Sequence, residues 1–317
     1  MPEGKTFRRS CASNLIGLLL FMAMVGAVFM FVRSVQELRP AALPPTATPL
    51  PTPTLRPTNT PTPLPSPTIT PVPPTATPVD PNDTGWVEVR SGLEARQQAI
   101  ISLEDGRVLE RVTIMRLDPN QFNFDIGYSP GSPKTLESWR RDSGAILTVN
   151  AGYFTADYLA TGLTIVQGQP TGSSYGPFAG MVTIGGAEPS ANIDVRWLRQ
   201  APYNPAEQLW AGFQSFPMLV HSGGVAAFPP SSDNGDRSQR TVIGKTTDGR
   251  IILLATTRAW FTLSEISSWL AQSDLNLELA INLDGGTSTG LILDHPNQSL
   301  AILPFSPLPT VLLVYEN

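Results

Sequence analysis

Three short segments of the chain carry amide, carboxylate and guanidinium side chains at the ends of strand-like apolar runs. They are residues 147–154 (LTVNAGYF), 240–244 (RTVIG) and 279–288 (LAINLDGGTS). Side chains two residues apart on a strand share a face, so the third segment delivers Asn282 and Asp284 to one side, ahead of a flexible glycine pair. Asp284 is therefore the strongest candidate for an acid–base or charge-stabilising residue.

The other two segments supply complementary groups. Asn150 can both donate and accept at a strand end, and Gly152 lets a ligand or another backbone approach closely. The guanidinium of Arg240 suits two-point contact with a phosphate or a carboxylate. Each segment also has an ordinary structural interpretation, in which the amides cap strand ends, the guanidinium forms a surface ion pair and Asp-Gly-Gly is a plain turn.

The elements that must position these groups are mostly strands, because short apolar runs separated by Gly, Pro, Asn and Asp dominate the sequence after residue 85. The expected strands are residues 108–115, 122–128, 145–150, 163–166, 181–184, 194–197, 218–221, 241–245, 251–256, 279–283, 289–293 and 311–315. Asp248-Gly249 supplies a turn between two of these runs and predicts a hairpin. The pattern favours an α+β domain with mixed or antiparallel sheets and few helices.

Few segments show helical periodicity. The clearest begins at Thr262, where Thr262 and Glu265 have the spacing of a capping box and the following apolar residues fall on one face. We expect two further short helices, over residues 136–141 and 205–210.

Composition excludes several classes of function. The 317 residues are 15% charged with a net charge of −5, so a broad basic surface for nucleic acid is not expected. The single cysteine, Cys11, rules out an internal disulfide and a cysteine-based zinc site. His221 and His295 are the only histidines, which excludes a site with three histidine ligands.

The N-terminal part predicts a membrane anchor. Residues 15–32 form an uncharged apolar run, which as a helix would span roughly 27 Å, close to the thickness of a bilayer core. Positive charge in residues 1–14 keeps that short end in the cytoplasm and places the rest of the chain outside the cell membrane as a single-pass protein. A cleaved signal peptide is the alternative, with small residues near Ala27 as its cleavage site.

Residues 33–84 predict an extended linker. Half of the 32 prolines lie between Pro40 and Pro81, alternating mainly with threonine, so this part buries too little apolar surface to fold. The folded domain is then expected over residues 85–317.

NAGYF, RTVIG and NLDGGTS, in this order and at these separations, resemble the motifs of the phosphodiester glycosidase family, and the resemblance covers residues 144–315. It implies hydrolysis of a sugar 1-phosphodiester, with cleavage at the anomeric carbon and release of the sugar from a phosphorylated acceptor. On that basis Arg240 and the amides of Gly285 and Gly286 would hold the phosphodiester. Asp284 would act as base toward water or stabilise the oxocarbenium-like state.

The expected substrate-binding residues are Asn150, Gly152, Tyr153, Phe154, Thr241, Asn282, Gly285, Gly286 and Ser288. Among them the side chains of Asn150, Asn282 and Ser288 would orient sugar hydroxyls. Tyr153 or Phe154 would stack on the sugar ring. His221 is a candidate proton donor beside the catalytic pair Asp284 and Arg240, with a structural role as its alternative. The oxygen-rich residues 231–236 make calcium a candidate cofactor, with a mobile loop as the alternative.

Three functions fit these observations. The first is a membrane-anchored hydrolase of sugar 1-phosphodiesters outside the cell, with a sugar phosphodiester or surface glycan as its partner. The second is a non-catalytic carbohydrate-binding or envelope-organising protein on the same domain. The third is a hydrolase of another phosphodiester, such as a nucleotide or a phospholipid head group.

Overall fold

A computed structural model describes residues 80–317. The predicted membrane span and nearly all of the predicted linker lie outside these residues. Within residues 80–317, no helix has the length and apolar character needed to cross a bilayer.

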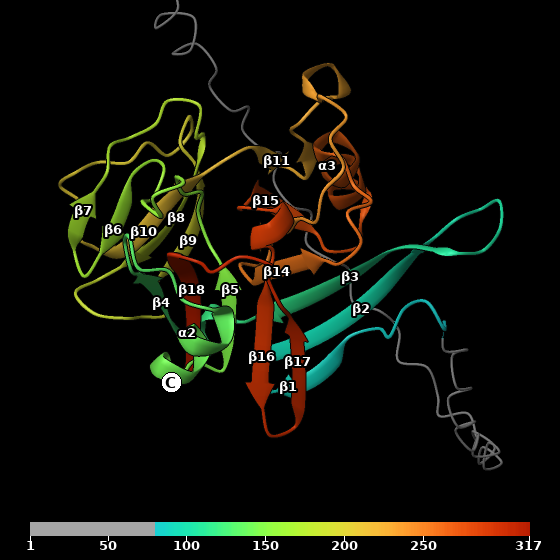
Figure 1. The fold of residues 1–317 in the computed structure, drawn as a ribbon, viewed down its shortest axis with the longest axis horizontal. Coiled ribbons are helices and arrows are strands. Elements are labelled where there is room, and N and C mark those ends of the chain that lie inside the picture. Colours follow the sequence, from blue (N-terminus) through green and yellow to red (C-terminus); the bar gives the residue numbers. More distant parts are fainter. Residues whose placement is uncertain (1–79) are drawn as a thin grey trace, which may run out of the picture. The chain divides into compact units, whose positions relative to one another are not determined.

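Strands form the framework of this part of the chain, in three sheets (Figure 1). The largest sheet has the order β1 (Val87–Arg90), β2 (Leu93–Ile101), β3 (Val108–Leu117), β14 (Ile251–Thr256), β13 (Thr241–Thr246), β15 (Leu277–Asn282), β11 (Met218–His221) and β12 (Val225–Ala226). The predicted hairpin is confirmed, because β13 and β14 pair antiparallel on either side of the Asp248-Gly249 turn.

The other two sheets have five strands each. One has the order β7 (Gln169–Thr171), β6 (Thr164–Val166), β10 (Leu209–Ser215), β8 (Gly180–Gly185) and β9 (Ile193–Trp197). The other has the order β17 (Gln298–Ile302), β16 (Leu291–His295), β5 (Leu147–Asn150), β18 (Thr310–Glu316) and β4 (Phe122–Tyr128). Every named strand pairs antiparallel with its neighbours, so the antiparallel form of the predicted fold holds.

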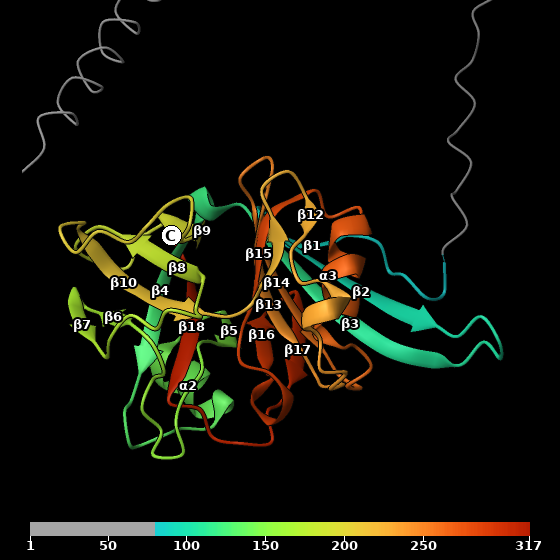
Figure 2. The ribbon, with the colours of Figure 1, turned by 90° about the horizontal axis from the view of Figure 1, so that it is seen from above.

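Alternating side chains of the strands build two layers of core. Ile243 and Ile281 of the large sheet face the main core, which all three sheets share. Their neighbours Val242 and Ala280 face the other way, onto α3 (Leu263–Gln272), which lies beside β11 and β12 (Figure 2). The β13 and β15 strands are therefore covered on both faces.

The described residues contain two α-helices, and both were expected from the sequence. The α2 helix (Leu136–Ser143) packs Leu136 and Trp139 against β16 and β18. The α3 helix begins after Thr262, which forms the predicted capping box with Glu265.

The helix predicted over residues 205–210 is wrong. Residues 204–207 form a turn, in which the side chains of Asn204 and Glu207 accept from nearby backbone N–H groups. Leu209 then opens β10, which pairs with both β6 and β8. Pairing with strands on both edges of β10 outweighs the local preference for a helix. The local sequence does not reveal this pairing, because the partner strands are distant in the chain.

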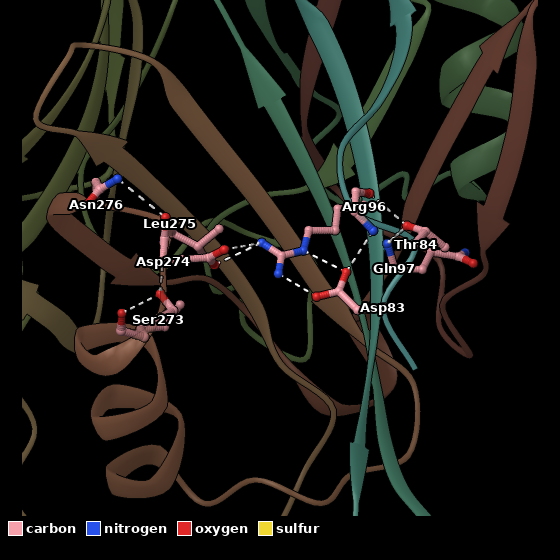
Figure 3. Close-up of polar contacts among 10 residues, drawn as sticks. Asp83, Thr84, Arg96, Gln97, Ser273, Asp274, Leu275 and Asn276 are labelled. Carbon is pink, nitrogen blue, oxygen red and sulfur yellow. Dashed lines mark hydrogen bonds and ion pairs between the residues drawn. The ribbon is translucent and has the colours of Figure 1, made fainter. Parts of the chain in front are cut away.

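A buried guanidinium fastens the start of the described chain to the large sheet (Figure 3). Arg96 of β2 donates from Nε to Asp83 and from Nη1 to Asp274, each at 2.8 Å. Asp83 also pairs with Gln98 as an isolated bridge, so Asp83 and Thr84 already contact β2, ahead of the predicted start of the domain at residue 85.

Candidate active site

The three segments singled out in the sequence meet where two sheets adjoin. Thr241 opens β13 and Asn282 closes β15, and the antiparallel pairing of Val242 with Asn282 brings these strand ends together. Asn150 closes β5, which belongs to a different sheet. The N–H of Asp284 donates to the carbonyl of Ala151 at 3.1 Å, so the two sheets are joined by the candidate residues themselves.

Asn150 holds this junction together. Its Nδ2 donates to the carbonyl of Asp284 at 2.7 Å, and its Oδ1 accepts from the hydroxyl of Thr241 at 2.8 Å and the N–H of Gly290 at 3.0 Å. The side chain is buried, and both ends of its amide are engaged within the protein. Asn150 and Thr241 therefore position Asp284 rather than contact a sugar hydroxyl.

Asp284 is a carboxyl group largely withdrawn from water. Burial raises the pKa of Asp284 to about 6, although hydrogen bonds from the Ser288 hydroxyl and the Gly285 N–H act in the opposite direction. The Gly285 N–H lies 2.9 Å from Oδ1 of Asp284. Ser288 thus supports the carboxylate, and the group titrates close to the range in which general bases operate.

The backbone amides of Gly285 and Gly286, which were expected to bind the phosphodiester, are both hydrogen-bonded within the protein. The Gly285 N–H donates to Asp284, and the Gly286 N–H donates to the carbonyl of Gln239 at 2.8 Å. Both donors are used within the protein because the loop folds back on residue 239. The glycines serve close packing instead, since a Cβ on Gly285 would lie 2.8 Å from the Gln239 carbonyl oxygen and Gly286 has φ +58°.

Arg240 is a buried cation, only 8% exposed. Its Nε donates to the carbonyl of Phe261 at 3.2 Å, and its Nη2 donates to the carbonyl of Asp236 at 2.7 Å. Burial lowers the pKa of Arg240, and no carboxylate among residues 80–317 forms an ion pair with it. A desolvated guanidinium held by carbonyl groups alone is well suited to bind an anion.

Asn282 and Tyr153 form the wall next to Asp284. Asn282 Nδ2 donates to the Tyr153 hydroxyl at 2.7 Å, and that hydroxyl donates to the carbonyl of Phe216 at 2.8 Å. Burial, followed by the charge of Asp284, raises the pKa of Tyr153, whereas the charge of Arg240 lowers it. The phenol therefore stays protonated, within electrostatic reach of both charged residues.

One polar atom of this wall has no partner. Oδ1 of Asn282 is buried without a hydrogen bond among the described residues. An unsatisfied buried acceptor is destabilising by about 1–3 kcal/mol, so Asn282 is held in this position at a cost in stability.

Aromatic rings extend from Tyr153. Phe178 contacts Tyr153, Tyr175 and Phe216 at centroid distances of 5.5, 4.9 and 6.0 Å. Phe216 and Tyr175 are 36% and 48% exposed, so they give this end of the site an apolar surface. Sequence reasoning missed these three rings because nothing in their local pattern separates them from core aromatics.

The buried amide of Gln214 holds the loop that carries Tyr175. Its Oε1 accepts from the N–H groups of Leu163 and Tyr175, and its Nε2 donates to Ser174, each at 3.0 Å. Gly152 lies in the same region, where a Cβ would approach Phe213 to 3.2 Å and the Gln214 carbonyl to 3.3 Å. Gly152 thus provides the close backbone approach that the sequence suggested, toward another strand rather than a ligand.

Phe154 does not join the cluster. Its ring stacks on Tyr158 at 5.8 Å and packs toward the core beneath α2. Of the two rings expected to stack on a sugar, the structure therefore brings only Tyr153 to the site, with its hydroxyl already bonded.

His221 lies away from Asp284. It closes β11, which runs antiparallel to β15 from the pair Met218 and Ile281, so His221 sits roughly 10 Å along the strand from the Asn282 end. Its ring stacks on Trp197 at 4.0 Å, and burial lowers its pKa. The structure does not bring the predicted proton donor to the other candidates.

The loop proposed for calcium, residues 231–236, is tied to α3. Asp233 accepts from the N–H groups of Ser264 and Gly235. Burial raises the pKa of Asp233, but hydrogen bonds from the side chains of Ser264 and Thr262, together with these N–H groups, outweigh burial and lower it. The Asp236 carboxylate accepts from Asn234. Within the described part of the chain, no group of three or more His, Cys, Asp or Glu side chains is arranged to hold a metal ion.

A comparison with known families covers the part of the chain that carries these residues. Residues 143–315, more than half of the chain, match the family described as phosphodiester glycosidase. No curated protein matches the chain.

Two solved structures share the fold. The catalytic domain of zebrafish N-acetylglucosamine-1-phosphodiester alpha-N-acetylglucosaminidase, auto-inhibited by its pro-peptide, has 18% identity and a TM-score of 0.55, over 71% of this chain and 84% of that one. A hypothetical protein from Synechocystis has 18% identity and a TM-score of 0.50, over 73% of this chain and 63% of that one. The family match covers all three segments that meet around Asp284, and the chain belongs to the phosphodiester glycosidase family.

Proposed function

We propose that this protein hydrolyses sugar 1-phosphodiesters, releasing the sugar from a phosphorylated acceptor. The observation that carries the proposal is that a shielded carboxyl group, Asp284, and a buried guanidinium, Arg240, both lie within electrostatic reach of Tyr153. A carboxylate can act as base or stabilise positive charge at the anomeric carbon, and a cation can stabilise negative charge on the phosphate. Membership of the family supports the same reaction class.

Arg240 contacts the non-bridging oxygens of the phosphodiester. As the bond between the anomeric carbon and the phosphate oxygen breaks, its electron pair leaves with the phosphate monoester, and the guanidinium stabilises the charge that develops there. A phosphate monoester is a good leaving group, so the step requires no strong general acid. This agrees with a site in which the bonds of Asn150 and Gly285 hold a single carboxylate, Asp284, at the sheet junction.

Asp284 acts at the anomeric carbon. With its pKa near 6, most of the group is ionised at neutral pH. The carboxylate then takes the proton of an attacking water as the new carbon–oxygen bond forms, or stabilises the oxocarbenium-like state electrostatically. Asn150 and Ser288 keep it oriented in both cases.

The sugar lies against the exposed rings that extend from Tyr153. Phe216 and Tyr175 offer apolar surface to a sugar ring. The anchor expected at residues 15–32 would hold this domain outside the cell membrane, where surface glycans carry such linkages.

The experiment is hydrolysis of a panel of sugar 1-phosphodiesters by the full chain, beginning with N-acetylglucosamine 1-phosphate linked to a simple alcohol. We expect free sugar and a phosphate monoester as products, and loss of the reaction in Asp284→Asn. Asp105→Asn, in the exposed turn between β2 and β3, is the matched control.

Three outcomes separate the possibilities. Cleavage that survives Asp284→Asn would remove Asp284 from the mechanism. Failure to cleave any member of the panel, together with saturable glycan binding, would favour a carbohydrate-binding protein. Cleavage of nucleotide or lipid phosphodiesters in preference to sugar diesters would reassign the substrate class.

A further inference from the structure

A second buried acid lies on β3, outside the residues that match the family. Glu110 is fully buried, and its carboxylate accepts four backbone N–H groups. Oε1 accepts from Arg111, Thr257 and Arg258 at 2.9, 2.9 and 2.7 Å, and Oε2 accepts from Trp260 at 3.0 Å. All four bonds are to backbone amides, and three come from a single loop.

That loop follows β14 and depends on the carboxylate for its shape. Thr257, Arg258 and Trp260 all direct their N–H groups to Glu110, while Ala259 between them has φ +53°, a left-handed conformation unusual for a residue with a side chain. A single side chain that accepts from three N–H groups of one turn holds them in a fixed arrangement. Glu110 therefore fixes the path of residues 257–260.

The same loop holds the segment that carries Arg240. The carbonyl of Phe261 accepts from Arg240 Nε at 3.2 Å and from the N–H of Ser238 at 3.3 Å. The carbonyl of Thr257 accepts from Gln239 Nε2 at 2.8 Å. The carbonyl of Gln239 in turn receives the N–H of Gly286, next to the Asp284 loop.

We propose that Glu110 is a positioning residue for the active site, which sets the direction of the Arg240 guanidinium through the loop at residues 257–261. The inference rests on the proposed function, in which Arg240 holds the phosphodiester. It assigns a role to β3, which lies outside the family match. Through Glu110, this strand fixes the loop that bonds to the Arg240 guanidinium.

The test is Glu110→Gln in the full chain. It retains the size of the side chain but replaces one oxygen with an NH₂ group, which cannot accept from the amides that face it. Glu94→Gln is the matched control, because Glu94 is a carboxylate on the adjacent strand β2 that bonds to Arg116 and Arg250, away from Arg240.

The first measurement is independent of catalysis. The ¹⁵N–¹H resonance of Arg240 Nε is assigned by its loss in Arg240→Lys and is then followed in both glutamine variants. We expect it to shift and exchange faster with water in Glu110→Gln, and to stay unchanged in Glu94→Gln. An unchanged Arg240 resonance in folded Glu110→Gln would overturn the proposal, whether or not the protein cleaves diesters.

The second measurement uses the phosphodiester substrate. Misplacement of a binding group by a fraction of an ångström to one ångström lowers kcat/KM on the order of tenfold to a hundredfold, and we expect Glu110→Gln to fall in that range. Combining it with Arg240→Lys should produce little further loss, because both changes act on one contact. Full additivity of the two losses would contradict a shared path, whereas absence of cleavage in the unmodified protein would count against the proposed function alone.

Discussion

Replacing Asp284 with asparagine should abolish activity and at the same time stabilise the protein. Asparagine keeps the shape of the side chain and an oxygen that can accept from the Gly285 N–H, but it has no charge to withdraw from water. In the unmodified protein the ionised carboxylate is held in a site that favours its neutral form. The substitution therefore removes a cost of folding that serves the chemistry.

The size of the effect follows from the pKa of Asp284. Folding raises it from 3.8 to about 6. Each pKa unit corresponds to about 1.36 kcal/mol, so the ionised group destabilises the folded state by about 3 kcal/mol at neutral pH. Because the folded-state pKa is the higher one, the associated stability is present below pH 3.8 and is lost as the pH rises through about 6.

Urea unfolding of the full chain at pH 4.5 and pH 7.5 measures this directly. The other titrating groups contribute equally to both proteins and cancel in the difference between them. The advantage of Asp284→Asn over the unmodified protein should grow by about 2 kcal/mol between these two pH values. A difference that is independent of pH, or that shrinks as the pH rises, would refute the assignment of a raised pKa to Asp284.

Four further predictions concern the same site. If Asp284 works as a carboxylate, kcat/KM should decline below about pH 6 as the group becomes protonated. Gly285→Ala should reduce activity and stability, the latter by about 1–3 kcal/mol, because its Cβ meets the Gln239 carbonyl, whereas Gly176→Ala, which meets open space, should be neutral in both assays. Tyr153→Phe should lower stability by about 1–2 kcal/mol in urea unfolding, since it removes the bonds to Phe216 and Asn282. His221→Gln should leave diester cleavage unchanged; a large loss would restore His221 to the mechanism.

The residues of the site were recognisable from the sequence because each lies at a strand end. Asn150, Arg240 and Asp284 lie at or next to the ends of apolar runs that are long enough to identify as strands. What the sequence did not reveal was how their hydrogen bonds are distributed. Asn150 and the two glycine amides resemble ligand-binding groups in sequence, yet hydrogen bonds within the protein occupy them.

The remaining differences come from contacts between segments far apart in the chain. A helix was expected over residues 205–210, but residues 209–215 form a strand because β6 and β8 pair with both of its edges. Glu110 reads as an ordinary charged residue on a strand until residues 257–260 fold over it. Local periodicity contains neither kind of information, because the decisive partner lies about 30 to 150 residues away.

Burial shifts the pKa values of Asp284 and Arg240 in opposite directions. It raises the pKa of the carboxyl group and lowers the pKa of the guanidinium. A mutual ion pair would relieve both penalties, yet the two side chains bond to other groups: Arg240 to the carbonyls of Phe261 and Asp236, and Asp284 to Gly285 and Ser288. Asn150 bonds to the backbone of Asp284, and the loop fixed by Glu110 bonds to Arg240, so each charged residue is held by its own neighbours. A phosphodiester placed at Arg240 would supply a negative charge to the desolvated cation and leave Asp284 free for the anomeric carbon, so the two buried groups together favour a substrate that carries both a phosphodiester and an anomeric carbon.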